Sequence, residues 1–443
     1  MFVPQGVWAI AYSRGATMEL DLVPGRSVGP FSLGMAISEA LSIIKVTREI
    51  SRADIKFNQE NPMSSDIFID LSKDGTLLRF DAVTQRLKVV EVYNAQLVRL
   101  RYNREVVCGP DVDATFALIY DRFGSSFPSP YCNGFYYLHY LAGLSFTFPI
   151  PAQFKDIYAT PDELPFEFPD GSGSPIASRI LVYHPGQRHK VSSLPKQPME
   201  FDAAASVGSS TSSMSSMVLS KPALVATVLS GVELENGPTI TFDSSVQDVV
   251  SLLGEPTVVH RKTEDKMRIH SQDNSVRPLL DYFYNYFDLG FDLLFDGVSH
   301  TVKKIVLHTN FPCHYDFNRY TKCDFRIDFP EGYDSEAVGV GHLVPSTSNE
   351  LLAPAREEPV LLIEEPLHPE EADDILSVFP HTKWSSITRA LGEPGKPVVH
   401  HRGTVANPFG QTYFFGYKGV VFEIMKNEYI ASVCLFRPAT VAR

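Results

Sequence analysis

An internal repeat constrains the fold of this chain more than any other feature of its sequence. Residues 74–92 align without a gap on residues 289–307, and each stretch reads as an apolar strand, a polar turn after Phe-Asp and a second apolar strand. This pattern predicts a β-hairpin in both places. Residues 419–435 repeat it with a shorter turn, and a weaker copy starts at Gly143, with its return strand predicted at 180–183. Such recurrence predicts a fold assembled from copies of one supersecondary unit.

A short amphipathic helix is predicted ahead of each hairpin. Apolar residues recur there with the i, i+3, i+4, i+7 spacing that gives a helix one apolar face. The predicted helices cover residues 37–44, 116–123, 246–253 and 384–391. Three of them are followed by glycine, at Gly124, Gly254 and Gly392, which we expect to end each helix in the left-handed conformation. Ser244 and Gln247 match a capping box at the start of the third helix.

These signals predict an α+β fold with four copies of a short helix and an antiparallel β-meander. One short helix covers only one face of a small sheet, so we expect the copies to pair into two halves. Serine-rich and acidic stretches between the copies predict disordered linkers. The predicted parts are an N-terminal extension (1–17), an N-terminal half with copies one and two (18–190), a serine-rich linker (191–236), copy three (237–328), an acidic linker (329–378) and copy four (379–443).

The net charge of −13 is concentrated in one segment. Residues 330–375 carry twelve acidic residues and one basic residue, and so account for −11 of this total. The rest of the chain is nearly neutral, which argues against a broad nucleic-acid surface. No apolar run reaches the ~20 residues that span a bilayer. The five cysteines are scattered and odd in number, so we expect a cytoplasmic protein without a disulfide framework.

The densest group of potential metal ligands and nucleophiles lies in residues 308–323. It consists of His308, Cys313, His314, Asp316 and Cys323. The residue types suggest a mixed His/Cys zinc site or a Cys-His nucleophile pair. However, the spacings match no closed zinc pattern, and free cysteines are commonly buried as small hydrophobes. We therefore predict no catalytic residue, no metal site and no cofactor, and keep a metal-dependent or Cys-His hydrolase as the less favoured alternative.

Aromatic side chains are interleaved with polar ones in residues 281–295. Such interleaving occurs in platforms that stack single-stranded nucleic acid, but those platforms also carry basic groove residues. On a strand, the tyrosines at 282, 284 and 286 would face one way and residues 283, 285 and 287 the other. Burial of both faces of a sheet explains the pattern without a ligand, and no nucleic-acid partner is predicted.

A small basic cluster occurs in the third copy. Its members are Arg261, Lys262, Lys266, Arg268, Lys303 and Lys304. It is a candidate surface for anionic lipid or an acidic partner, at ~1 kcal/mol per basic residue near a charged membrane. The alternative is a solvated sheet edge whose cations discourage edge-to-edge pairing. Both interpretations stay open at this point.

Several segments together resemble the phagosome assembly factor family, a eukaryotic group also labelled lin-10-like. The resemblance covers most of residues 18–150, 237–328 and 380–437 in the family's order. It departs at residues 1–17, at about 150–236 and in the acidic segment. The segments that carry it are ELDLVPGRS (19–27), LGM (33–35), FDAVTQRLKVVEV (80–92), EDKMRIHS (264–271), DYFYNYFDLGFDLLFD (281–296), VKKIVLHTNFPCHYDFNRYTKCDF (302–325) and NPFG (407–410).

The resemblance implies a non-enzymatic adaptor in autophagy. Family members form a complex with a β-propeller protein of the breast carcinoma amplified sequence type. The resemblance also implies recruitment from the cytoplasm to the phagophore assembly site, a preautophagosomal structure, with phosphoinositide contact made largely by the propeller. The older family label suggests an adaptor in Golgi or vesicle trafficking as the alternative.

Overall fold

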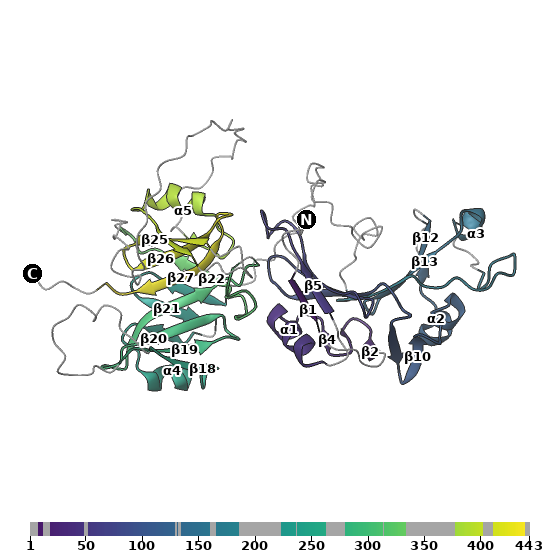
Figure 1. Ribbon diagram of the computed structural model, residues 1–443, viewed down its shortest axis with the longest axis horizontal. Coiled ribbons are helices and arrows are strands. Elements are labelled where there is room, and N and C mark those ends of the chain that lie inside the picture. The colour runs from purple at the N-terminus through teal and green to yellow at the C-terminus, as the bar shows by residue number, and fades with distance from the viewer. Residues whose placement is uncertain are drawn as a thin grey trace, which may run out of the picture. The chain divides into compact units, whose positions relative to one another are not determined.

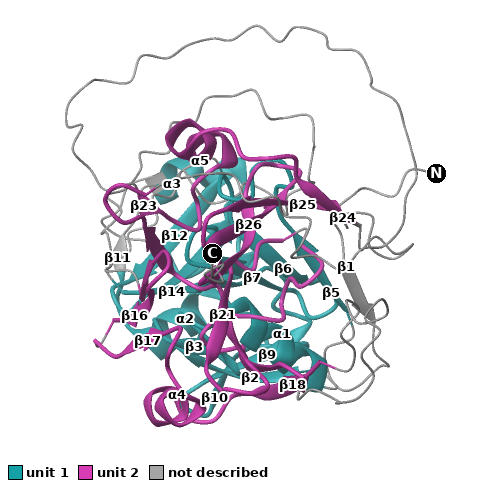
Figure 2. Ribbon diagram, turned by 90° about the vertical axis from the view of Figure 1, so that its left-hand side faces the viewer, with its two compact units in different colours: residues 1–216 teal, residues 217–443 magenta. Residues whose placement is uncertain are grey.

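The chain forms two compact units, residues 1–216 and residues 217–443 (Figures 1 and 2). The computed structural model describes residues 8–11, 18–47, 52–128, 131, 134–159, 165–185, 223–235, 237–262, 280–312, 314–333, 377–401 and 411–438. These residues form mostly antiparallel sheet with few, short helices, so the predicted α+β class holds in this coarse form. None of the described helices combines the length and the apolar character needed to cross a bilayer.

The first unit is built on a nine-stranded sheet. Its order is β1 (Trp8–Ala11), β5 (Arg52–Lys56), β6 (Ile67–Leu71), β7 (Thr76–Phe80), β8 (Leu87–Val92), β14 (Arg179–Tyr183), β13 (Leu144–Pro149), β12 (Phe135–Tyr140) and β11 (Phe127–Pro128). β8 and β14 pair antiparallel at its centre, so one meander continues into the other. The predicted hairpin at 74–92 and the return strand at 180–183 are confirmed by the pairs β7–β8 and β13–β14.

A smaller sheet and two helices cover one side of this large sheet (Figure 1). The helices α1 (Ile37–Val46) and α2 (Phe116–Phe123) lie on the same side as the small sheet. Its order is β10 (Glu105–Cys108), β9 (Val98–Tyr102), β2 (Met18–Val23), β3 (Ser27–Val28) and β4 (Phe31–Ser32), with β2 and β9 parallel. The short helices η1 (Ala152–Phe154) and α3 (Lys155–Ala159) lie in the long connection between β13 and β14.

The second unit has the same kind of layout. Its eight-stranded sheet has the order β18 (Val258–Arg261), β19 (Tyr282–Tyr286), β20 (Phe291–Phe295), β21 (Val302–His308), β27 (Ile430–Phe436), β26 (Val420–Met425), β25 (Gln411–Tyr417) and β24 (Val398–His401). The small sheet has the order β17 (Thr239–Thr241), β16 (Gly231–Leu234), β15 (Leu224–Thr227), β22 (Phe325–Asp328) and β23 (Ser377–Val378), with β15 and β22 parallel. The helices α4 (Val246–Leu253) and α5 (Trp384–Leu391) lie at opposite ends of the unit (Figure 1).

One hydrophobic core joins both sheets and both helices of the second unit. Leu293 of β20 and Leu435 of β27 belong to it, together with Phe325 of β22 and Ile387 of α5. Because side chains alternate along a strand, the residues between these core positions point to the opposite face of the large sheet. That opposite face carries the polar groups described in the next section.

The same contacts recur around the helices. The N-cap residue of each of four helices bridges to the chain at the start of a hairpin's return strand, in the pairs Ala36–Arg86, Thr115–Ile176, Ser245–Thr301 and Lys383–Tyr429. Three helices end at glycine, and the glycine carbonyl accepts a hydrogen bond from a tyrosine at the end of a strand. These bonds are Tyr140 to Gly124 (3.2 Å), Tyr286 to Gly254 (3.2 Å) and Tyr417 to Gly392 (2.8 Å).

Two local expectations need correction. The capping glycines have positive φ as expected, at 74°, 79° and 84°, but ψ is close to 180°, so they are not in the left-handed helical conformation. The capping box of α4 uses Ser245 and Asp248. The predicted Ser244 belongs to the preceding turn, where its hydroxyl accepts from the amide of Thr241.

Short strands lie within the predicted linkers and the predicted extension. The serine-rich linker 191–236 includes β15 and β16, the acidic linker 329–378 includes β23, and the extension 1–17 includes β1, which pairs with β5. Strands of two to four residues carry too little periodicity to be detected beside polar sequence. The serine-rich core of the first linker (206–220) and the acidic residues 334–374 lie outside the described residues.

Candidate functional site

The basic cluster is partly neutralised by its own neighbours. Nζ of Lys303 lies 3.2 Å from Asp281 and 3.1 Å from Asp296, and Nζ of Lys262 lies 3.8 Å from Asp281. Partial burial lowers the pKa of Lys303, but its bonds to Asp296 and Asp281 outweigh this effect and raise the pKa. Two of the six cations therefore pair with carboxylates beside β19 and in the β20–β21 turn, which reduces the positive charge that they offer to a partner.

The remaining cations of the cluster are separated. Arg261 is exposed at the end of β18, and Lys304 lies on β21, three strands further into the sheet. Among the described residues, no carboxylate lies within ion-pair distance of either one. Lys266 and Arg268 lie outside the described residues, so the structure does not place them with the others.

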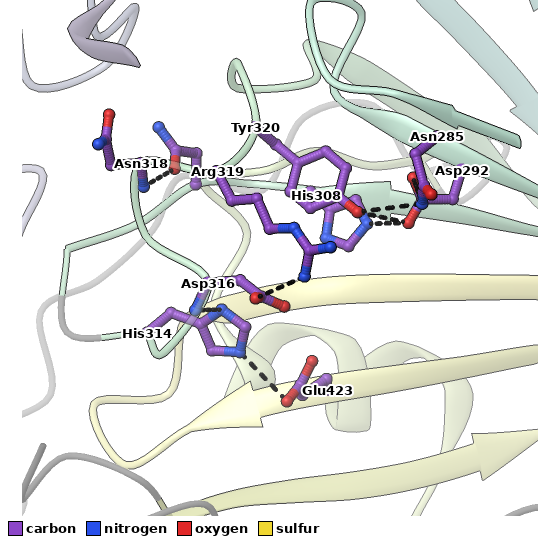
Figure 3. Close-up of polar contacts among 10 residues, drawn as sticks. Asn285, Asp292, His308, His314, Asp316, Asn318, Arg319, Tyr320 and Glu423 are labelled. Carbon is purple, nitrogen blue, oxygen red and sulfur yellow. Dashed lines mark hydrogen bonds and ion pairs between the residues drawn. The ribbon is translucent and has the colours of Figure 1, made fainter. Parts of the chain in front are cut away.

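The segment that sequence analysis singled out for metal or catalysis connects β21 to β22. It begins at the buried His308 and packs on the polar face of the large sheet (Figure 3). Two separate histidine–carboxylate pairs hold it there: His308 with Asp292 of β20, and His314 with Glu423 of β26. Sequence analysis identified both histidines and neither carboxylate.

Asp292 is the centre of the first pair. Its Oδ2 lies 3.0 Å from Nε2 of His308 and accepts a hydrogen bond of 2.8 Å from the Tyr320 hydroxyl. Oδ1 accepts from the Asn285 amide at 2.7 Å. The rings of His308 and Tyr320 stack with their centroids 3.7 Å apart. Burial, together with the charge and hydrogen bond of Asp292, raises the pKa of Tyr320, so its hydroxyl stays protonated as a donor.

Glu423 is the centre of the second pair. It is 3% exposed, and its Oε1 lies 3.2 Å from Nε2 of His314. The hydroxyls of Thr412 and Ser432 donate to its two carboxylate oxygens at 2.8 and 2.6 Å. Burial raises the pKa of Glu423, but the hydrogen bond and charge of His314 and the two hydroxyl donors outweigh it and lower the pKa to about 2. The carboxylate is therefore ionised, and both of its oxygens interact with protein donors.

These groups form one row across the sheet. Asn285 and Asp292 are direct cross-strand partners, as are His308 and Ser432, and Ser432 and Glu423. The row contains Asn285 (β19), Asp292 (β20), His308 (β21), Ser432 (β27), Glu423 (β26) and Thr412 (β25). Next to it, the Thr309 hydroxyl lies 2.6 Å from the carbonyl oxygen of Ile430. The connection between β21 and β22 is thus fixed to strands on both sides of the central β21–β27 pair.

Among the described residues, no cysteine is hydrogen-bonded to His308 or His314. A Cys-His mechanism requires a thiol in hydrogen-bond reach of the histidine. Cys323 instead belongs to the hydrophobic core on the other face, and burial raises its pKa to about 12. Cys313 lies outside the described residues, and the described residues contain no group of three His, Cys, Asp or Glu side chains arranged to hold a metal ion. The geometry supports a structural role for the two histidine–carboxylate pairs, which hold the β21–β22 connection on the large sheet.

The carboxylates were missed because a lone Asp or Glu in a strand usually marks the solvated face. The available signal was that Asp292 and Glu423 each interrupt a run of otherwise apolar strand residues, FDLLF and VVFEIM. Such an interruption in a strand that is buried throughout indicates a paired carboxylate, because an unpaired one would be costly.

The tyrosines of the aromatic run at 281–295 face the hydrophobic core, as expected. Tyr286 belongs to the hydrophobic core, and Tyr282 and Tyr284 pack against it, while Asn285 turns to the polar row. The strand thus places its tyrosines on one face and its polar residue on the other, in agreement with the predicted alternation.

Comparison with known proteins places the chain in a family. No solved structure matches it. A PHAF1 protein of Arabidopsis thaliana is 37% identical and covers 96% of this chain and 94% of its own length. A PHAF1 protein of Drosophila melanogaster is 34% identical, with 95% of each chain covered. The model of the phagosome assembly factor 1 family matches residues 27–436. The chain therefore belongs to the phagosome assembly factor 1 family.

Proposed function

We propose that this protein is a non-enzymatic adaptor in autophagy. It joins a β-propeller protein of the breast carcinoma amplified sequence type and is recruited with it from the cytoplasm to the phagophore assembly site. The observation that carries the proposal is the family match over residues 27–436, which supports a role in phagosome assembly. An adaptor role also fits the two histidine–carboxylate pairs, because they hold the connection between β21 and β22 against the sheet.

The scaffold in this proposal consists of four copies of one helix-and-meander unit, paired into two halves. Support comes from the order of the two large sheets, each of which reads as two meanders joined at the centre. Further support comes from the recurring N-cap bridges and from the three tyrosine–glycine bonds. A duplicated scaffold presents similar surfaces more than once, so differences between copies identify the surfaces that have become specialised.

In this proposal, the complex binds phosphoinositide membranes mainly through the propeller protein, and this chain contributes little. Of the basic cluster, Lys303 and Lys262 lie against Asp281, which leaves Arg261 and Lys304 as the described cations most available to an anionic headgroup. Two such residues contribute about 2 kcal/mol near a charged membrane, too little for stable attachment alone. We expect the isolated chain to sediment weakly with phosphoinositide vesicles and the complex to sediment strongly.

Affinity purification from starved cells tests the proposal. Tagged full-length protein should recover the β-propeller protein in near-stoichiometric amount, and both should gather at preautophagosomal structures. Recovery of the chain without a propeller partner would contradict the adaptor model. A steady location on Golgi membranes in fed cells would instead favour the trafficking alternative.

A further inference from the structure

The β18 strand is an exposed edge of the large sheet in the second unit. It pairs with β19 on one side and is the last strand in the sheet order of the described residues. All four of its residues are exposed, and two of them are apolar neighbours, Val258 at 43% and Val259 at 48%. Natural proteins usually protect such edges with prolines, bulges or charges, because the free backbone groups can pair with another strand.

The direction of the backbone groups follows from the ladder. The amide of Lys262 donates to the carbonyl of Asp281 at 3.1 Å, in register with the pairing of β18 and β19. Groups of an antiparallel strand alternate between its two sides. The amides and carbonyls of Arg261 and Val259 therefore point away from β19, toward the open edge. They offer two donors and two acceptors to an added strand.

The side chains beside these groups are an apolar residue and a cation. Val259 is opposite Tyr284, and Arg261 is opposite Tyr282, so both side chains lie on the tyrosine face of the sheet. Among the described residues, no carboxylate neutralises Arg261. The edge thus displays an apolar position and a positive charge two residues apart on one face.

The other edge of the same sheet provides a comparison. β24 has nearly the same sequence, Val-Val-His-His where β18 has Val-Val-His-Arg, and it pairs only with β25 among the described strands. His401 stands where β18 has Arg261, so the fixed positive charge is absent there. His400 of β24 also packs against the rings of Phe414 and Tyr315. Both edge strands pair antiparallel with their neighbours, and they differ in charge at the position of Arg261.

We propose that β18 is a docking edge for an extended segment of a partner protein that carries an apolar residue and an acidic residue two positions apart. The segment adds a strand to the sheet, and its backbone pairs with the outward groups of Val259 and Arg261. Its apolar side chain lies beside Val259 and its carboxylate beside Arg261, because residues two apart in a strand share a face. This inference does not depend on the identity of the propeller partner.

Fluorescence anisotropy with a labelled peptide tests the proposal on the full chain. The peptide Thr-Glu-Thr-Val-Thr-Glu-Thr has a glutamate two positions before and two positions after its valine, so it can pair with β18 in either orientation. A version with lysine in place of both glutamates is the charge control. The acidic peptide should bind at least about tenfold more tightly than the lysine peptide, because opposite charges across strands attract and like charges repel. Arg261→Glu should invert this preference.

Two proline variants separate strand pairing from charge attraction. Val259→Pro removes an outward amide without removing a bond to β19, and should weaken peptide binding about tenfold or more. Val399→Pro, at the matching position of β24, should leave binding unchanged. Thermal unfolding checks that each variant is folded. If Val259→Pro does not fold, Arg261→Glu still tests the proposal.

Three results would overturn the proposal. They are failure of the wild-type chain to bind the acidic peptide at about 1 mM, equal binding by Arg261→Glu, and a dimer of the free chain that Val259→Pro dissociates. The last result would assign the edge to a second copy of this protein. The interaction should be weak, since a single short strand gains few contacts.

Discussion

At the scale of single residues, Glu423 gives the clearest dependence of stability on pH. Its pKa is about 2 in the folded protein and 4.5 without the surrounding structure. The ionised form therefore favours the folded state. This contribution is fully present above about pH 4.5 and is lost as the pH falls toward about 2.

The Glu423→Gln variant tests this assignment. At pH 7 we expect its free energy of unfolding to fall by about 2–3 kcal/mol, because the buried network loses its negative charge and one of its two acceptor oxygens. The difference from the wild type should shrink between about pH 4.5 and about pH 2. Urea unfolding at several pH values measures both effects. The exposed Glu393→Gln serves as control, and a difference that stays constant with pH would contradict the account.

Asp74 should show the opposite sign. Burial raises its pKa to about 6, although Lys73 lowers it in part, and its Oδ2 accepts no hydrogen bond from any described residue. The protonated form therefore favours the folded state, and the benefit is lost as the pH rises from about 4 to about 6.

Asp74→Asn should therefore raise the free energy of unfolding at pH 8 by about 1–2 kcal/mol and have little effect at pH 4. Asp66→Asn is the matched comparison. Asp66 accepts from Lys88 at 2.6 Å and from Arg79, so its loss should destabilise the fold at pH 8. If the two variants changed the free energy of unfolding equally at pH 8, the ionised forms of Asp74 and Asp66 would contribute equally to stability, which would contradict the prediction.

At the scale of elements, a tyrosine hydroxyl ties a helix end to the large sheet. The hydroxyl of Tyr417 donates to the Gly392 carbonyl at 2.8 Å, which joins α5 to the end of β25. Tyr417→Phe should cost about 1 kcal/mol in denaturant unfolding, because it leaves a carbonyl without its donor. Tyr284→Phe, whose hydroxyl has no hydrogen-bond partner among the described residues, should change stability by less than about 0.5 kcal/mol. Equal costs would contradict the proposed role of this bond.

The sequence was informative about local elements and less so about long-range ones. The helix at 246–253 and the hairpin at 289–307 were predictable, because apolar spacing and turn residues act over short distances. The parallel pairing of β15 with β22 joins residues about a hundred positions apart, and no periodicity encodes such a partner. The site was predictable only in part: His308 and His314 stood out as chemistry-bearing residues, but their carboxylates come from other strands.

At the scale of the whole molecule, the second unit should fold by itself. Its hydrophobic core draws on both of its sheets and both of its helices, and all members lie within residues 217–443. A fragment of residues 217–443 should therefore show one cooperative unfolding transition. A fragment that starts at residue 237 should not, because it removes the core residues Leu224, Ala226, Val228 and Val232. Cooperative folding of both fragments would show that β15 and β16 are dispensable.

The adaptor role is the central claim, and it concerns the complex. The most direct measurement is the mass of the purified full-length chain mixed with the purified β-propeller protein, by light scattering after gel filtration. We expect a single species heavier than either protein alone, formed equally by the wild type and by Glu423→Gln at pH 7 if that variant is folded. Separate elution of the 49.4 kDa chain and the propeller protein at micromolar concentrations would contradict it.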